Sequence, residues 1–252
     1  MTTTHGELRI EPASEILEAT RRWLAPVRAA LGSEFLSAYL TGSVLTQGFD
    51  PAHSRVNVLV VSRTLSGEML DALAAAIPTG KRPPHFDPLF LTHSQILKSL
   101  DVFPIEWLDI REQHLRIEGD DLCATLEVPR TNLRLQCEHE LRGKHIRLRQ
   151  AYLLAPRKAP ELTHVLKTMA SSFAALFRTL LRLRDEKVPS DTAHVIQRVA
   201  DVYGLDATGL LGLHLLRYSA KQYKADEVLA IYRRFLVEIE RLVNAIDQLS
   251  VT

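Results

Sequence analysis

The stretch YLTGSVLTQGFDPAHSRVNVLVV, residues 39–61, decides the expected fold of the first part of the chain. An apolar segment ends at Gly42 and Ser43, and a valine-rich segment follows Asn57. Valine-rich runs are typical of buried strands, and a glycine between two such runs indicates a tight turn. Small residues in a turn leave backbone N–H groups free to hold a phosphate. We therefore expect a strand, a Gly-Ser turn with phosphate-binding capacity, and a second strand.

The spacing within this stretch resembles the nucleotidyltransferase superfamily. Its signature is Gly-Ser followed, about a dozen residues later, by Asp-x-Asp on the next strand. In this chain Arg55 stands twelve positions after Ser43, and Asn57 follows two positions later. The resemblance implies a nucleotidyltransferase fold, and in that family the two aspartates hold Mg²⁺ over the nucleotide triphosphate. Mg²⁺ is normally bound by carboxylates. Arg55 and Asn57 therefore occupy the positions of the motif but do not supply its metal ligands.

The first half of the chain alternates helical and strand-like patterns. We expect helices over residues 12–31, after Ser62 or Ser66, and after Thr92, and strands over residues 34–40, 58–61, 88–91 and 104–110. Such alternation indicates an α/β (α+β) domain with a small mixed sheet. The boundaries that we assign to this nucleotidyltransferase-like domain are residues 1–128.

Residues 129–252 show long helical periodicities and almost no strand-like run. The clearest stripe repeats every three or four residues from Val228 to Ile246, as expected for a helix with one buried face. Breaks at residues 155–156, at residues 188–189 and at Gly204 separate the helical segments. The sequence therefore predicts a second domain, an all-α bundle of four or five helices.

A second motif lies in CEHELRGKHIRLR, residues 137–149, near the start of the expected bundle. Glu140 and Lys144 are four positions apart and so share one helix face. The segment resembles the Glu-x-x-Gly-Lys of kanamycin-type aminoglycoside nucleotidyltransferases. That resemblance implies that Glu140 is a general base on an acceptor hydroxyl and that Lys144 meets the triphosphate. The alternative is a solvated ion pair worth about 0.3 to 0.5 kcal/mol.

Other charged residues are weaker candidates. Arg142, together with the basic residues that follow it on the same helix, can form a phosphate-binding face or a solvated one. Glu106 and Asp109 lie on the expected strand from Pro104 and can supply a third acid of the family type. The alternative is that both acids are solvated at a strand edge. No Cys-x-x-Cys or His-x-x-x-His spacing predicts a metal site.

Composition limits the classes of function. The chain has 252 residues and a formal net charge of +1, so nothing attracts it globally to nucleic acid or to an anionic membrane. No apolar run reaches the ~18 residues of a membrane span. The two cysteines form no disulfide framework, so we expect a reducing compartment and a cytoplasmic location.

Three hypotheses follow. The first is a protein that binds a nucleotide or another phosphorylated small molecule without a required cofactor and without transferase activity. Its binding residues would be Gly42, Ser43, Arg55, Asn57, Arg142 and Lys144. The second is an active transferase that needs Mg²⁺, with Glu140, Asp109 and Glu106 as acids, and that acts on a small hydroxylated acceptor. The third is a structural module whose apolar bundle stripes form a homodimer.

Overall fold

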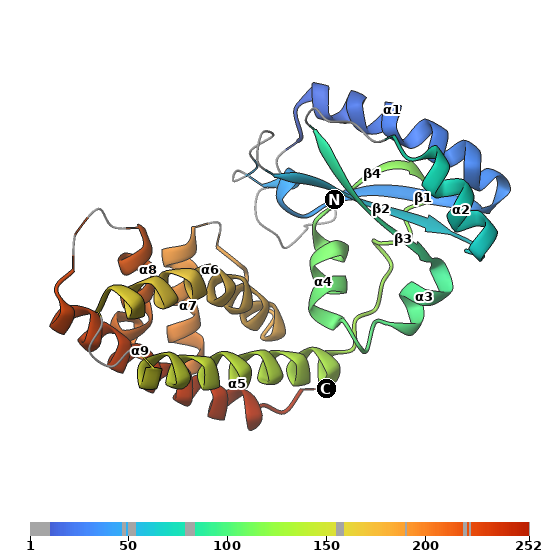
Figure 1. Cartoon of the computed structure of the whole chain (residues 1–252). Helices are drawn as coiled ribbons and strands as arrows, with labels where there is room; N and C mark the ends of the chain where they lie inside the picture. The colour runs from blue at the N-terminus through green and yellow to red at the C-terminus, as the bar shows by residue number, and fades with distance from the viewer. Residues whose placement is uncertain are drawn as a thin grey trace. The chain divides into compact units, whose positions relative to one another are not determined.

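The computed structural model describes most of the chain, namely residues 11–46, 49, 54–78, 84–154, 159–189, 191–218, 221 and 223–251. The chain divides into two compact units, and the division falls between Pro129 and Arg130. Figure 1 shows a mixed α/β unit formed by the first half and a helical unit formed by the second. Among the described helices, none is long and apolar enough to cross a membrane.

The first unit is built on a sheet whose described strands have the order β3-β2-β1-β4. Strand β1 (Phe35–Thr41) lies antiparallel to β2 (Arg55–Ser62) and to β4 (His114–Gly119). Strand β2 pairs in parallel with β3 (His85–Thr92). The prediction of a small mixed sheet is therefore confirmed, and the Gly-Ser turn follows directly after the central strand β1.

Helices cover both faces of this sheet. Helices α1 (Ser14–Leu31) and α2 (Gly67–Ala76) pack on the face that carries Val56, Val58 and Val60. Helices α3 (His93–Lys98) and α4 (Pro104–Glu112) pack on the face that carries Leu59 and Val61. Because side chains alternate along a strand, Arg55 and Asn57 belong to the same face as Leu59.

Two predicted helix starts are confirmed by their capping contacts. The Ser66 hydroxyl accepts a hydrogen bond from the Met69 backbone N–H, with 3.3 Å between nitrogen and oxygen. Thr92 and Gln95 form a reciprocal capping box at the start of α3. Both contacts satisfy backbone donors that a helix leaves free in its first turn.

The expected strand over residues 104–110 is wrong, because this segment forms α4. Pro104, Trp107 and Leu108 are buried at helical spacing, and a proline is favourable in the first turn of a helix. The sequence analysis also missed strand β4. Its signal is the alternation of apolar Leu115 and Ile117 with polar neighbours before the positive-φ residue Gly119.

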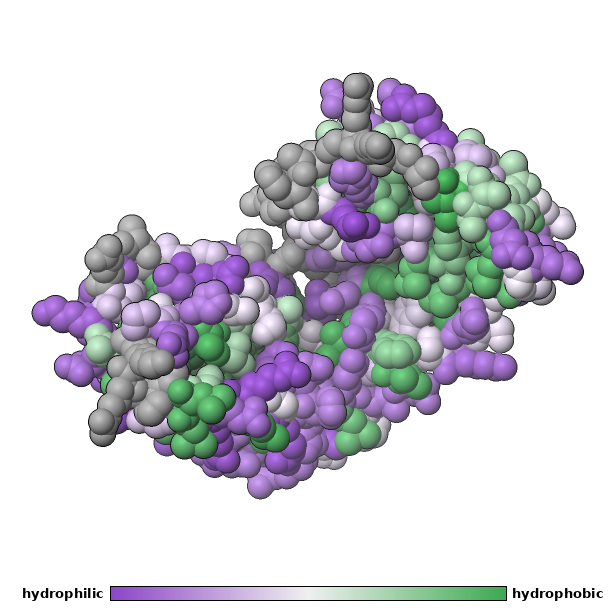
Figure 2. All heavy atoms as spheres, viewed as in Figure 1, coloured by the Kyte–Doolittle hydropathy of each residue, from purple (hydrophilic) through white to green (hydrophobic). Residues whose placement is uncertain are grey.

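The second unit is helical throughout its described elements, which are α5 (Arg130–Leu154), α6 (Ala159–Leu183), α7 (Thr192–Tyr203), α8 (Ala207–Tyr218) and α9 (Ala225–Asp247). Helix α6 packs on all four of the others, and α9 packs on α5, α6 and α8. The face of this unit seen in Figure 2 is mostly hydrophilic, as expected when the apolar stripes lie inside. The helix break predicted at residues 155–156 lies outside the described residues.

Candidate functional site

The Gly-Ser turn begins where β1 ends. Gly42 has a φ of 72°, a left-handed conformation that favours glycine, and it starts the short 3₁₀ turn Gly42–Leu45. Gly42 and Ser43 are exposed, whereas Val44 and Leu45 are buried in the core on the α1 side of the sheet. The buried pair anchors the turn, so the two small residues are held at the surface.

Asn57 lies directly beside this turn. It is paired with Thr41, the last residue of β1, in the antiparallel register of β1 and β2. A Cβ atom on Gly42 would lie only 2.9 Å from Nδ2 of Asn57. The structure thus brings together Gly42 and Asn57, while Arg55 lies two residues away on the same face of the same strand, with its side chain exposed.

Strand β3 adds two residues that the sequence analysis did not select. The parallel register places His85 beside Arg55 and Asp87 beside Asn57. Register partners share one face of a sheet, so the exposed Asp87 contributes a carboxylate to the face that carries Asn57. The expected strand began at residue 88. Its real signal is the alternation of inward Phe86 and Phe90 with outward Asp87.

The described residues near the turn do not form a typical metal centre. In the described part of the chain, no three His, Cys, Asp or Glu side chains gather where they could hold a metal ion. The two acids proposed from the sequence, Glu106 and Asp109, are exposed on helix α4 rather than on a strand of the sheet. The expectation of a third strand acid at either position is therefore wrong, because the segment is helical.

Glu140 and Lys144 lie in the second unit, on helix α5. Lys144 Nζ donates a hydrogen bond to Glu140 Oε2 at 2.7 Å, so the predicted i,i+4 ion pair is present. This hydrogen bond is the main cause that lowers the pKa of Glu140 below its usual value. A lower pKa makes the carboxylate a weaker proton acceptor, and the Lys144 charge is already balanced. The local geometry therefore favours the ion-pair interpretation.

Arg142 also has acidic partners within the second unit. Its Nε donates to Glu138 at 2.7 Å, and its Nη2 lies 3.3 Å from an Asp247 carboxylate oxygen. The hydrogen bond from Arg142 is the largest cause that lowers the pKa of Glu138. Arg149 is paired in the same way with Glu240 of α9 at 3.2 Å. Much of the basic face predicted on α5 is thus neutralised by neighbouring carboxylates.

The described part of the chain thus has a Gly-Ser turn between two antiparallel strands of a small mixed sheet, followed by a helical unit. Among solved structures, the chain is similar to spectinomycin adenyltransferase AAD(9) from Enterococcus faecialis, whose structure was determined with ATP and spectinomycin. The TM-score is 0.51 and the sequence identity is 14%, over 93% of this chain and 99% of that one.

No protein-family model matches the sequence, and no curated protein matches it. The similarity to the solved structure therefore concerns the fold. It confirms the nucleotidyltransferase-like layout that the Gly42-Ser43 motif predicted. The chemistry has to be argued from the residues of this chain.

Proposed function

We propose that the first unit binds the phosphate of a nucleotide or of another phosphorylated small molecule at the Gly42-Ser43 turn, without metal-dependent group transfer. The observation that carries this proposal is the contact between Gly42 and Asn57. An amide, which has no net charge, fills the position beside the turn at which the family signature places a metal-binding carboxylate.

Arg55 supplies the charge that such a ligand needs. Its side chain is exposed, and within the described residues it has no ion-pair partner. A guanidinium group can make two parallel hydrogen bonds to phosphate oxygens, so it can balance phosphate charge without a metal ion. The turn adds backbone N–H donors with no side chain on Gly42 to block them.

Group transfer has weaker support. Nucleotidyl transfer depends on neutralising the charge that develops on the phosphates, and loss of one such element costs several kcal/mol of barrier height. The carboxylate that the strand register provides beside Asn57 is Asp87. A single carboxylate with a phosphate ligand can still hold Mg²⁺. This residue therefore supports a second candidate, a slow transferase that uses Mg²⁺.

The homodimer and the cytoplasmic location stay predictions. The apolar residues of α9 that were expected to form a dimer surface, among them Tyr232, Phe235 and Ile239, are buried within the helical unit. They form the core of the bundle, and a dimer would need a different surface.

The proposal is tested by calorimetric titration with ATP in the absence of divalent metal. We expect binding by the unaltered protein and at least a tenfold weaker affinity for Arg55→Ala, because a charge-assisted contact to phosphate is lost. Arg63→Ala is the matched control, since Arg63 is an exposed arginine just beyond the other end of β2. Equal losses in both variants, or no loss in either, would contradict a phosphate site at Arg55.

A further inference from the structure

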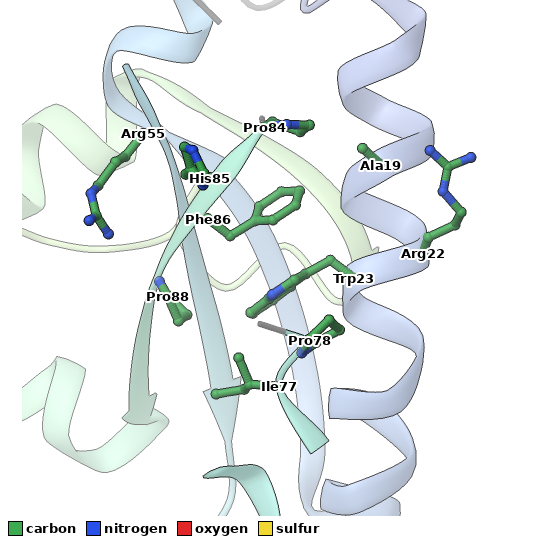
Figure 3. A pocket seen from close by; sticks show the side chains of 10 residues that line it. All are labelled: Ala19, Arg22, Trp23, Arg55, Ile77, Pro78, Pro84, His85, Phe86 and Pro88. Atoms are coloured by element: carbon green, nitrogen blue, oxygen red, sulfur yellow. The ribbon is translucent and has the colours of Figure 1, made fainter. Parts of the chain in front are cut away.

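The first unit contains a hollow of about 520 Å³ between helix α1 and the edge strand β3. We call it the Trp23 hollow. Figure 3 shows its lining, in which Trp23 of α1 and Phe86 of β3 lie next to each other, with Ile77 and Pro78 close to the indole ring. A hollow of this size is within the range of pockets that hold small organic molecules.

The aromatic pair gives the hollow its chemical character. The rings of Trp23 and Phe86 are stacked, with 5.3 Å between their centroids and 27° between their planes. Prolines at positions 78, 84 and 88 add flat apolar surface to the same lining. Planar aromatic rings pack favourably on surfaces of this kind, with offset-stacked or edge-to-face geometry.

Each polar side chain in the lining can donate a hydrogen bond. The indole of Trp23 is largely buried and carries one N–H donor, Nε1. His85 lies beside Phe86, and Arg22 and Arg55 lie at opposite ends of the lining. None of the described residues that line the hollow is acidic.

The two arginines act at longer range than the histidine. In Figure 3 their guanidinium groups extend away from the aromatic pair, so they set the charge of the surroundings rather than contact a bound ring. His85 is closer to the rings and is a potential hydrogen-bond donor to an acceptor on the ligand. Aromatic surface and hydrogen-bond donors, with positive charge in the surroundings, favour one class of ligand.

We propose that the Trp23 hollow binds a planar aromatic ring that carries a negatively charged phosphate or carboxylate group. The site lies on the α1 side of the sheet, whereas the alternation of β2 places Asn57 on the opposite face. This inference goes beyond the phosphate site at Gly42-Ser43, with which the hollow shares only Arg55 among its described lining residues.

The test uses the emission of Trp23. The chain has two tryptophans, and the other one, Trp107, is buried on the opposite face with its Nε1 donating to Ser99 Oγ at 2.9 Å. In a Trp107→Phe background Trp23 is the single reporter, and circular dichroism verifies that this variant is folded. The ligands are AMP, benzoate, adenosine and inorganic phosphate. Calorimetry on the unaltered protein with the same ligands gives an independent affinity.

We expect saturable quenching by AMP or by benzoate. Adenosine lacks the negative charge and inorganic phosphate lacks the ring, so each should bind at least tenfold more weakly. Tighter binding of AMP would identify the ligand class as nucleotides, and tighter binding of benzoate would identify it as aromatic acids. Phe86→Leu removes the aromatic ring but keeps an apolar side chain, so it should weaken binding of the tighter anion about tenfold. His85→Ala should also weaken binding of this anion. The control is His194→Ala, which changes an exposed histidine of α7 and should leave the affinity unchanged.

Three results would overturn the proposal. The first is the absence of saturable quenching and of calorimetric heat with both aromatic anions. The second is quenching that stays unchanged in Phe86→Leu. Loss of quenching in Gly42→Ala would also overturn the proposal, because it would mean that the ligand binds at the Gly42-Ser43 turn. Failure of the phosphate site alone would show as ATP affinity that is the same in Arg55→Ala as in the unaltered protein, while the aromatic anion still quenches Trp23 saturably in the Trp107→Phe variant.

Discussion

Asn57 Nδ2 lies 2.9 Å from the position that a Cβ atom would take on Gly42. The amide of Asn57, near the start of β2, therefore lies beside the turn that follows β1, where we propose that phosphate binds. An aspartate at position 57 would present negative charge to any phosphate at the turn unless a cation stood between them. An asparagine presents a neutral amide, so the turn can accept phosphate without a metal ion.

Gly42→Ala should destabilise the protein. The new methyl group meets Asn57, and the φ of 72° costs about 1 kcal/mol for a residue with a side chain. We expect the free energy of unfolding in urea to fall by about 1 to 2 kcal/mol. Gly67→Ala is the control, because a Cβ atom there meets nothing within 4 Å. Equal stability of the two variants would show that Asn57 does not restrict the turn.

Arg55→Asp combined with Asn57→Asp should create a metal site. The two new carboxylates would lie on the same face as Asp87, which is in register with Asn57. Because Mn²⁺ and Mg²⁺ prefer clustered carboxylate oxygens, we expect the double variant to bind Mn²⁺ at least tenfold more tightly than the unaltered protein. Paramagnetic resonance of free Mn²⁺ measures this difference. Similar affinities in both proteins would mean that Asp87 does not point toward these positions.

Glu238 is expected to be important for the helical unit. Its side chain is 6% exposed, and it accepts hydrogen bonds from the Asp206 backbone N–H at 2.9 Å and from Arg241 at 3.2 Å. Glu238→Ala leaves the Asp206 donor without this acceptor and opens space beside Gly209, so we expect a loss of about 2 kcal/mol in the free energy of unfolding.

The exposed neighbour Glu240 provides the matched control for this prediction. It is 53% exposed and pairs with Arg149. Glu240→Ala should change the free energy of unfolding by less than about 1 kcal/mol. If the two variants are equally stable in urea, the hydrogen bond from Asp206 contributes little.

His145 makes the stability of the helical unit sensitive to acid. The side chain is buried, its Nε2 has no hydrogen-bond partner within the described residues, and burial is the main cause that lowers its pKa. The unfolded chain therefore takes up a proton first as pH falls through about 6.5. Proton uptake by the unfolded state favours unfolding, so this residue reduces stability below that pH and has no effect well above it.

The measurement is chemical denaturation at pH 7.5 and pH 5.5. His145→Leu should lose less stability between these two pH values than the unaltered protein, because the titrating group is gone. The exposed His194 provides the control, and His194→Ala should keep the pH dependence of the unaltered protein. Identical pH profiles for all three proteins would exclude His145 as the cause.

The turn and the helix caps could be predicted because each depends on a few adjacent residues. Gly42, Ser66 and Thr92 mark structural boundaries by their own backbone and side-chain chemistry. The role of Asp87 could not be predicted in the same way. Its place beside Asn57 depends on the parallel pairing of two strands that are separated by helix α2, and that register is not visible in either segment alone.

The error at residues 104–110 has a different origin. A short apolar segment is compatible with a strand or with a buried helix, and the three- and four-residue spacing from Pro104 to Trp107 and Leu108 is the signal that decides. The interpretation of Glu106 and Asp109 as strand acids followed from the same error. Both residues are exposed on α4, so a wrong element type placed them on the wrong structural element.

The central claim is that the Gly42-Ser43 turn and Arg55 hold phosphate without a metal ion. The most direct test is the ATP affinity of the unaltered protein in Mg²⁺ and in an excess of chelator, measured by calorimetry at one ionic strength. The account predicts dissociation constants that agree within about threefold, since Arg55 rather than a cation balances the phosphate charge. Binding that requires Mg²⁺ and is lost in chelator would contradict the claim and favour the metal-dependent transferase.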